Sequence, residues 1–129
     1  MSKILIVPDV HGRAFWHRAL ELVDQVDQIV FLGDYLDPYS HEGISFDLAL
    51  EEFNKILEFK KEYPDLITLL VGNHDMHYII KDFMDCSRRN TDMLDQLHKL
   101  YNSNLDLFNL IHIEDDWLFS HGGVYKGWM

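Results

Sequence analysis

Four short polar clusters in this chain combine residue types that bind metal ions and move protons. They are Asp9-Val10-His11-Gly12-Arg13, Gly33-Asp34-Tyr35-Leu36-Asp37, Gly72-Asn73-His74-Asp75 and Ser120-His121-Gly122-Gly123. Carboxylate and amide oxygens with imidazole nitrogens suit manganese, iron, zinc or nickel better than they suit a thiolate-binding metal. In an extended segment the side chains of Asp9 and His11 point the same way, so both can bind one cation. Asp34 could bridge two cations, because a carboxylate has two oxygens.

Apolar segments with two different periodicities separate these clusters. Three short continuous runs end at the first three clusters and predict strands buried on both faces, over residues 3–7, 28–32 and 66–71. Longer runs with apolar residues at helical spacing predict helices over residues 14–24, 45–61, 76–81 and 91–106. Two short β segments around residues 114–116 predict a hairpin before the last cluster. The order strand–helix–strand–helix–strand predicts an α/β domain with a largely parallel sheet flanked by helices.

The carboxyl ends of parallel strands meet at one edge of a sheet, where ligands of open α/β folds collect. We therefore expect the four clusters to converge on one edge of one sheet. Asp and Asn also favour turns, so any single cluster could be turn chemistry alone. Four clusters of this kind, each at the end of a strand, favour a metal site.

The charge balance agrees with a cation site. Twenty-two acidic residues against eleven basic ones give a net charge of −11. A chain this acidic is a poor non-specific binder of nucleic acid polymers or of anionic membranes. No apolar run approaches the roughly 18 residues of a membrane-spanning helix, and the single cysteine, Cys86, excludes an internal disulfide. We expect a cytoplasmic protein.

In this order, the four clusters resemble the motifs of the calcineurin-like metallophosphoesterase superfamily. The His121-Gly122-Gly123 element, preceded by a hairpin, is most similar to the branch of serine/threonine protein phosphatases and diadenosine tetraphosphatases. The resemblance implies that residues 1–129 form the first half of an αββα sandwich. The family continues past this element with a second sheet and a further metal-binding histidine, so we expect an incomplete domain, truncated at the C-terminus.

The resemblance also implies two divalent metal ions, with manganese favoured and iron, zinc or nickel as alternatives. Asp9 and His11 would bind the first metal, Asp34 would bridge both, and Asn73 and His121 would bind the second. A hydroxide that bridges the metals would then attack a phosphate ester.

Two further residues take proton-transfer roles by the same resemblance. His74 would protonate the leaving alkoxide, and Asp37 would orient His74. Protein phosphatases carry arginine and glycine after this aspartate, where this chain has Pro38 and Tyr39. Arg13 is our candidate for holding the substrate phosphate in place of that arginine, with Arg88 and Arg89 as alternatives.

The leading hypothesis is a phosphatase that acts on phosphoproteins or small phosphate monoesters. A nucleotide pyrophosphohydrolase or phosphodiesterase is the alternative, and a truncated, catalytically weak metal-binding module is a third hypothesis. The last strand would lie near a sheet edge, and Trp128 and Met129 would lack a following segment. Because exposed edges and apolar patches favour association, we expect self-association through residues 109–129.

Overall fold

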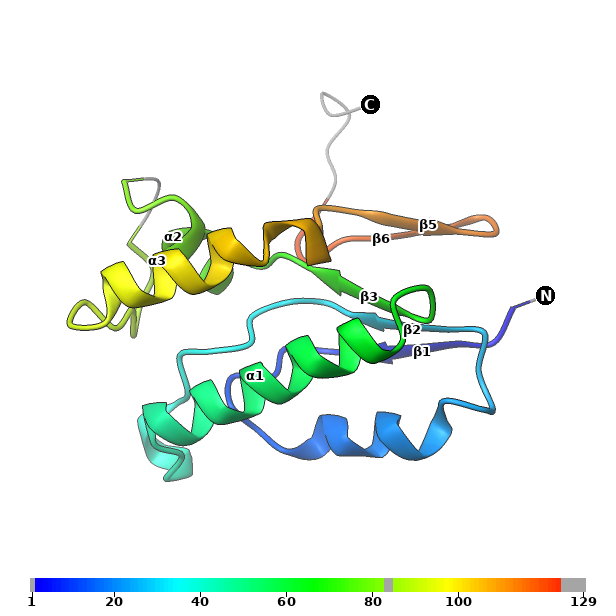
Figure 1. The fold of residues 1–129 in the computed structure, drawn as a ribbon, viewed down its shortest axis with the longest axis horizontal. Helices are drawn as coiled ribbons and strands as arrows, with labels where there is room; N and C mark the ends of the chain where they lie inside the picture. The colour runs from blue at the N-terminus through cyan, green and yellow to red at the C-terminus, as the bar shows by residue number, and fades with distance from the viewer. Residues whose placement is uncertain (1, 83–84, 124–129) are drawn as a thin grey trace.

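Four parallel strands form the main sheet of the computed structural model, which describes residues 2–82 and 85–123 (Figure 1). They lie side by side in chain order: β1 (Ile4–Val7), β2 (Gln28–Phe31), β3 (Ile67–Leu70) and β4 (Phe108–Asn109). Val7 pairs with Phe31, and Phe31 pairs with Leu69, so the first three strands end at nearly the same level. The predicted α/β fold with a largely parallel sheet is confirmed.

Helical segments connect the strands, close to the predicted ranges. The α-helices are α1 (Phe46–Glu62), α2 (Asn73–Ile79) and α3 (Leu94–Ser103), and the 3₁₀ segments are η1 (Phe15–Leu22), η2 (Ser40–Glu42) and η3 (Leu105–Leu107). Helix α1 begins after Ser45, whose side-chain oxygen accepts the backbone N–H of Leu48 at 3.1 Å. Three predictions need correction. The helix expected over 14–24 is a 3₁₀ segment, and the one expected over 76–81 begins three residues earlier, at Asn73. The one expected over 91–106 is α-helical only from Leu94 to Ser103.

The main core lies between one face of the sheet and the helices α1, η1 and α3. Alternate strand residues such as Ile29 and Phe31 point into it. Trp16 from η1, Phe53 from α1 and Tyr101 from α3 meet them there, each nearly or fully buried. This continuous core fixes β2 and β3 as a rigid base for the polar loops that follow them.

The opposite face of the sheet is covered by a hairpin. Strands β5 (His112–Glu114) and β6 (Trp117–Phe119) pair antiparallel in a sheet of their own. Phe119 packs there against Val30 and Leu70. The hairpin is confirmed, but its last strand belongs to a two-stranded sheet of its own and not to the one sheet at whose edge we expected all four clusters.

Strand β1 is less buried than predicted. It lies at the edge of the main sheet, and Ile6 stays 47% exposed because the hairpin covers only part of that face. The sequence does not predict strand β4, since two residues are too few to show an apolar pattern.

Among the described residues, no helix is both long and apolar enough to cross a bilayer. Trp128 and Met129, which figured in the expected self-association, lie outside the described residues.

Candidate metal centre

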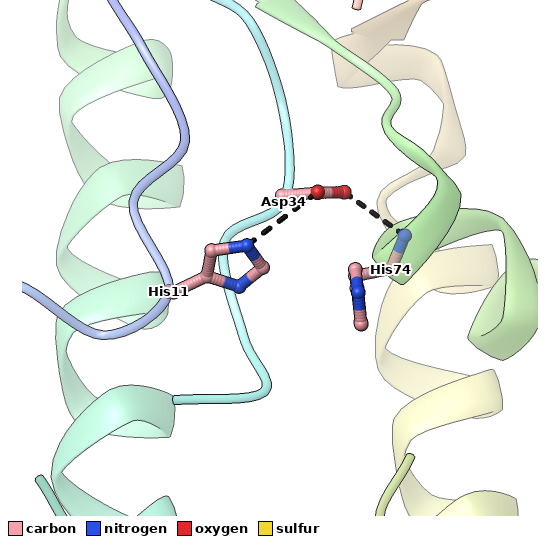
Figure 2. Close-up of side chains that lie close together, drawn as sticks. All are labelled: His11, Asp34 and His74. Atoms are coloured by element: carbon pink, nitrogen blue, oxygen red, sulfur yellow. Dashed lines mark hydrogen bonds and ion pairs between the residues drawn. The ribbon is translucent and has the colours of Figure 1, made fainter. Parts of the chain in front are cut away.

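The loops that follow β1 and β2 turn sharply at the residues that carry the chemistry. His11, Asp34 and Asp37 all have left-handed backbones, with φ of 44°, 57° and 62°. Such conformations are strained for residues other than glycine and cluster at functional sites. Here they turn side chains from separate strand ends toward one place. Figure 2 shows His11, Asp34 and His74 close together on three segments of chain, with the Asp34 carboxylate facing the ring of His11 and the backbone N–H of His74.

Two imidazoles are anchored so that the same nitrogen of each faces Asp34. The Nδ1–H of His11 donates to the carbonyl of Leu36 at 2.7 Å, and that of His121 donates to the carbonyl of Leu32 at 2.9 Å. The Nε2 atoms lie 3.6 Å and 3.3 Å from the same oxygen of Asp34, Oδ2. Histidine ligands of metals are commonly oriented through their other nitrogen in this way.

The other two expected ligands lie beside this pair of imidazoles. An oxygen of Asp9 lies 3.6 Å from Nδ1 of His121, and the other lies 4.0 Å from Nε2 of His11. The side-chain oxygen of Asn73 lies 3.1 Å from Nε2 of His121. The structure thus brings together all five residues for which we predicted metal binding.

Asp34 belongs to two potential metal-binding groups, one with Asp9 and His121 and one with His11 and His74. The donors are oxygen and nitrogen atoms, and a shared carboxylate suits a pair of cations. Gly72 permits this approach, because a Cβ there would overlap Oδ1 of Asp34 and would lie only 2.8 Å from Cε1 of His121. The donor set and this close approach fit the divalent ions that the sequence predicts.

The protonation of the site is set by these contacts. Burial lowers the pKa of His11, so its ring is neutral and Nε2 keeps a lone pair. The contact with Asp34 raises the pKa of His121 to about 9, so a proton occupies Nε2 where no cation is bound. Burial opposes ionisation of Asp34, yet the contact with His121 holds its pKa below the ordinary value. Asp34 is therefore ionised, and the positive charge beside it lies on His121.

His74 and Asp37 form a second, adjoining pair. Nδ1 of His74 lies 2.8 Å from Oδ2 of Asp37, and the hydroxyl of Tyr78 donates to the other carboxylate oxygen. His77 comes within 2.8 Å of Oδ2 as well. The three aromatic residues lie on one face of α2 because they are three and four positions apart. Burial opposes ionisation of Asp37, but the hydrogen bonds from His74 and Tyr78 and the close contact with His77 hold its pKa below the ordinary value.

Asp75, for which the sequence predicted no role, ties these loops together. Its carboxylate accepts the backbone N–H groups of Asp34 at 2.6 Å, Tyr35 at 3.3 Å and Gly72 at 2.8 Å, and the hydroxyl of Tyr101 at 2.5 Å. Burial raises its pKa to about 6. A sequence signal existed: an acidic residue at the third position of a helix, as in a capping box.

The expected substrate-binding arginine is already engaged. Arg13 makes a bidentate ion pair with Glu42, with contacts of 2.6 Å and 2.8 Å. Arg88 lies beside the proton-transfer pair: its Nε donates to the carbonyl of Asp37 at 3.0 Å, and its guanidinium lies 3.9 Å from the ring centroid of Tyr39. Arg13 lies beside a candidate metal ligand, with its Nη1 3.4 Å from the carbonyl oxygen of Asp9.

Comparison with known proteins agrees with this geometry. Residues 2–128 match the family described as calcineurin-like phosphoesterase. The serine/threonine-protein phosphatase 4 catalytic subunit of Candida glabrata is 31% identical over 95% of this chain, and the match covers 39% of that relative. A catalytic subunit of protein phosphatase 2A from Dictyostelium discoideum is 28% identical over the same shares. The serine/threonine-protein phosphatase SIT4 of Candida albicans is 33% identical over 60% of this chain and 25% of its own length. The chain spans about two fifths of the first and second of these relatives.

Proposed function

The chain belongs to the calcineurin-like phosphoesterase family, and on this premise we propose that it hydrolyses phosphate monoesters with the help of two divalent metal ions. One observation carries the proposal: the Nε2 atoms of His11 and His121 both face Oδ2 of Asp34, beside the pair formed by His74 and Asp37. Metal binding and proton transfer would then take place side by side.

Five residues would hold the ions: Asp9 and His11 one of them, Asn73 and His121 the other, and Asp34 both. When bound, divalent ions supply an activated water and neutralise charge on phosphoryl oxygens. The chain's own part is to fix the donors. The carbonyls of Leu32 and Leu36 orient the two imidazoles, and Gly72 leaves room for the carboxylate.

His74 is the proton donor of the proposal. Its Nδ1 is held by Asp37, which leaves Nε2 to hand a proton to the departing oxygen. Its ring centroid lies 5.0 Å from that of His11, so the donor adjoins the candidate metal centre. A proton donor placed in this way typically accelerates a reaction by about 10²–10⁴-fold.

Phosphorylated proteins are the substrate class that the relatives favour, since those described above are named as serine/threonine or type 2A protein phosphatases. Arg88 offers a guanidinium for an anionic substrate, and Arg13 a second one whose charge is shared with Glu42. Small phosphate monoesters fit the same chemistry. A cytoplasmic location stays a prediction.

A screen of metals against substrates tests the proposal. The chain is loaded in turn with manganese, iron, zinc or nickel and assayed on p-nitrophenyl phosphate, a phosphoserine peptide, bis(p-nitrophenyl) phosphate and diadenosine tetraphosphate. We expect two metal ions per chain by mass spectrometry and turnover of the two monoesters. Turnover of the diester or the dinucleotide alone would favour the alternative hydrolase. Bound metal without any turnover would leave a metal-binding module.

A further inference from the structure

His77 is a buried histidine that the proposed reaction does not yet use. It lies in α2, three residues after His74, and is fully buried. Its Nε2 lies 2.8 Å from Oδ2 of Asp37. Nδ1 of His74 lies 2.8 Å from the same oxygen. The imidazoles of His74 and His77 therefore share one buried carboxylate oxygen.

The backbone fixes which nitrogen of His77 carries the proton. The N–H of Cys86 donates to Nδ1 of His77 at 3.3 Å, so Nδ1 is the acceptor and the proton sits on Nε2. Within residues 2–82 and 85–123, Nε2 has no well-aligned hydrogen bond, which leaves Oδ2 of Asp37 as the acceptor at hand. A buried N–H without an acceptor destabilises the fold, so this group favours an Asp37 carboxylate that stays in place.

Asp37 needs such support, since its backbone is left-handed and its side chain is completely buried. Tyr78 holds Oδ1, and Arg88 holds the main-chain carbonyl. Oδ2 has only the two histidines as donors among the described residues. Without His77, Oδ2 of Asp37 would be held only by His74, although His74 is the ring that this oxygen has to orient.

We propose that His77 is a positioning residue for proton donation, whose Nε2–H fixes the Asp37 carboxylate that aims the ring of His74. The inference rests on the proposed function and deepens it. His77 transfers no proton itself and contacts no substrate. It acts through Asp37, so the loss of His77 should lower kcat more for substrates whose leaving group needs a proton than for those whose leaving group does not.

The test compares two substrates on matched variants. His77→Leu removes the N–H donor and replaces the ring with a side chain of similar volume. His77→Gln keeps an N–H at about the same distance from the backbone as Nε2–H. His98→Leu is the control, because His98 also contacts α2, through the carbonyl of Tyr78, but no carboxylate of the site. Each metal-loaded variant is assayed on p-nitrophenyl phosphate, whose leaving group needs little protonation, and on a phosphoserine peptide, whose alkoxide needs it.

We expect His77→Leu to lower kcat about tenfold on the phosphoserine peptide, part of the roughly 10²–10⁴-fold effect of a general acid, and less than about twofold on p-nitrophenyl phosphate. His77→Gln should restore most of the loss, and the metal content should not change. Equal losses on the two substrates, a loss of metal, or no loss would overturn the role. A wild-type chain that binds metal but turns over neither substrate would instead overturn the proposed function, and this role with it.

A measurement on the unaltered chain covers the case in which His77→Leu does not fold. Nitrogen-15 NMR distinguishes the two neutral forms of an imidazole. We expect His77 to carry its proton on Nε2, slowly exchanging with solvent. A proton on Nδ1 would overturn the proposal whatever the activity.

Discussion

Asp34 joins both candidate metal positions and the start of α2 through one side chain. One oxygen faces the imidazoles of His11 and His121, and the other accepts the backbone N–H of His74 at 2.9 Å. The side chain is nearly buried, so its charge is poorly screened by water. Its replacement therefore acts on both candidate metal positions and on the start of α2 together.

Asp34→Asn should remove the charge that both ions share while keeping the shape of the side chain. We expect most bound metal to be lost and kcat to fall by more than about 100-fold, since even outer partners of metal ligands contribute about 10–100-fold. Metal content by mass spectrometry and turnover of p-nitrophenyl phosphate check this. Asp24→Asn, at an exposed position, is the control. A variant with normal metal content and activity would contradict the bridging role.

His74→Asn should separate proton donation from metal binding. The side chain lies next to Asn73 but points its Nδ1 at Asp37, so we expect unchanged metal stoichiometry. Turnover of a phosphoserine peptide should fall by about 10²–10⁴-fold, and that of p-nitrophenyl phosphate by much less. A lost metal ion would assign His74 to the metal centre instead.

At this scale the sequence predicted which residues meet, but not how they are oriented. The residue types and their positions after strands were enough to place Asp9, His11, Asp34, Asn73 and His121 together. The choice of ring nitrogen depends on the carbonyls of Leu32 and Leu36, which any residue could supply. The pairing of Arg13 with Glu42 joins loops 29 residues apart and left no local signal.

Among the elements, η1 and α1 are joined by a buried carboxylate. Glu52 of α1 accepts the indole N–H of Trp16 at 2.9 Å and contacts Nε2 of His17 at 2.6 Å. Burial opposes ionisation of Glu52, but the bonds from His17 and Trp16 hold its pKa below the ordinary value of 4.5. This link holds the 3₁₀ segment against the helix that packs on the sheet.

The sign of this pKa shift predicts an acid-dependent stability. A carboxyl group with a lowered pKa in the folded state stabilises the fold above its ordinary pKa, and that contribution is lost as the pH falls through the folded value. Glu52→Gln should therefore lower the free energy of unfolding at neutral pH and flatten its fall as the pH drops below the ordinary value of 4.5. Urea unfolding at several pH values measures this. Glu51→Gln, one position along and exposed, should leave the curve unchanged.

Helices and strands were predicted correctly where the pattern of apolar residues extends over enough positions. The 17 residues of α1 and the apolar runs of β2 and β3 were found within two residues. The 3₁₀ geometry of η1 was missed, because its apolar spacing is also compatible with an α-helix. The separate hairpin sheet was missed because pairing partners of short strands are set by tertiary packing and not by their own residues.

At the scale of the whole molecule, the outer face of the hairpin is an apolar surface that the described residues leave exposed. Opposite residues of an antiparallel pair share a face, so His112 lies on the inner side with Phe119, while Ile113 and Leu118 share the outer side. Ile113 is 62% exposed and Leu118 is 43% exposed, with Leu110 nearby in the chain at 65%. Self-association through this surface stays a prediction.

Self-association through that face should depend on salt. A net charge of −11 makes two copies repel each other, and salt screens this repulsion while leaving apolar contact intact. We expect sedimentation at micromolar concentration to show a larger species whose share rises with sodium chloride. Ile113→Lys should shift the chain toward monomer. Leu20→Lys, at an apolar side chain 45% exposed on η1 over the other face of the main sheet, should not. A monomer at every salt concentration would mean that copies of this chain do not cover the hairpin, and an equal response of both variants would place the contact elsewhere.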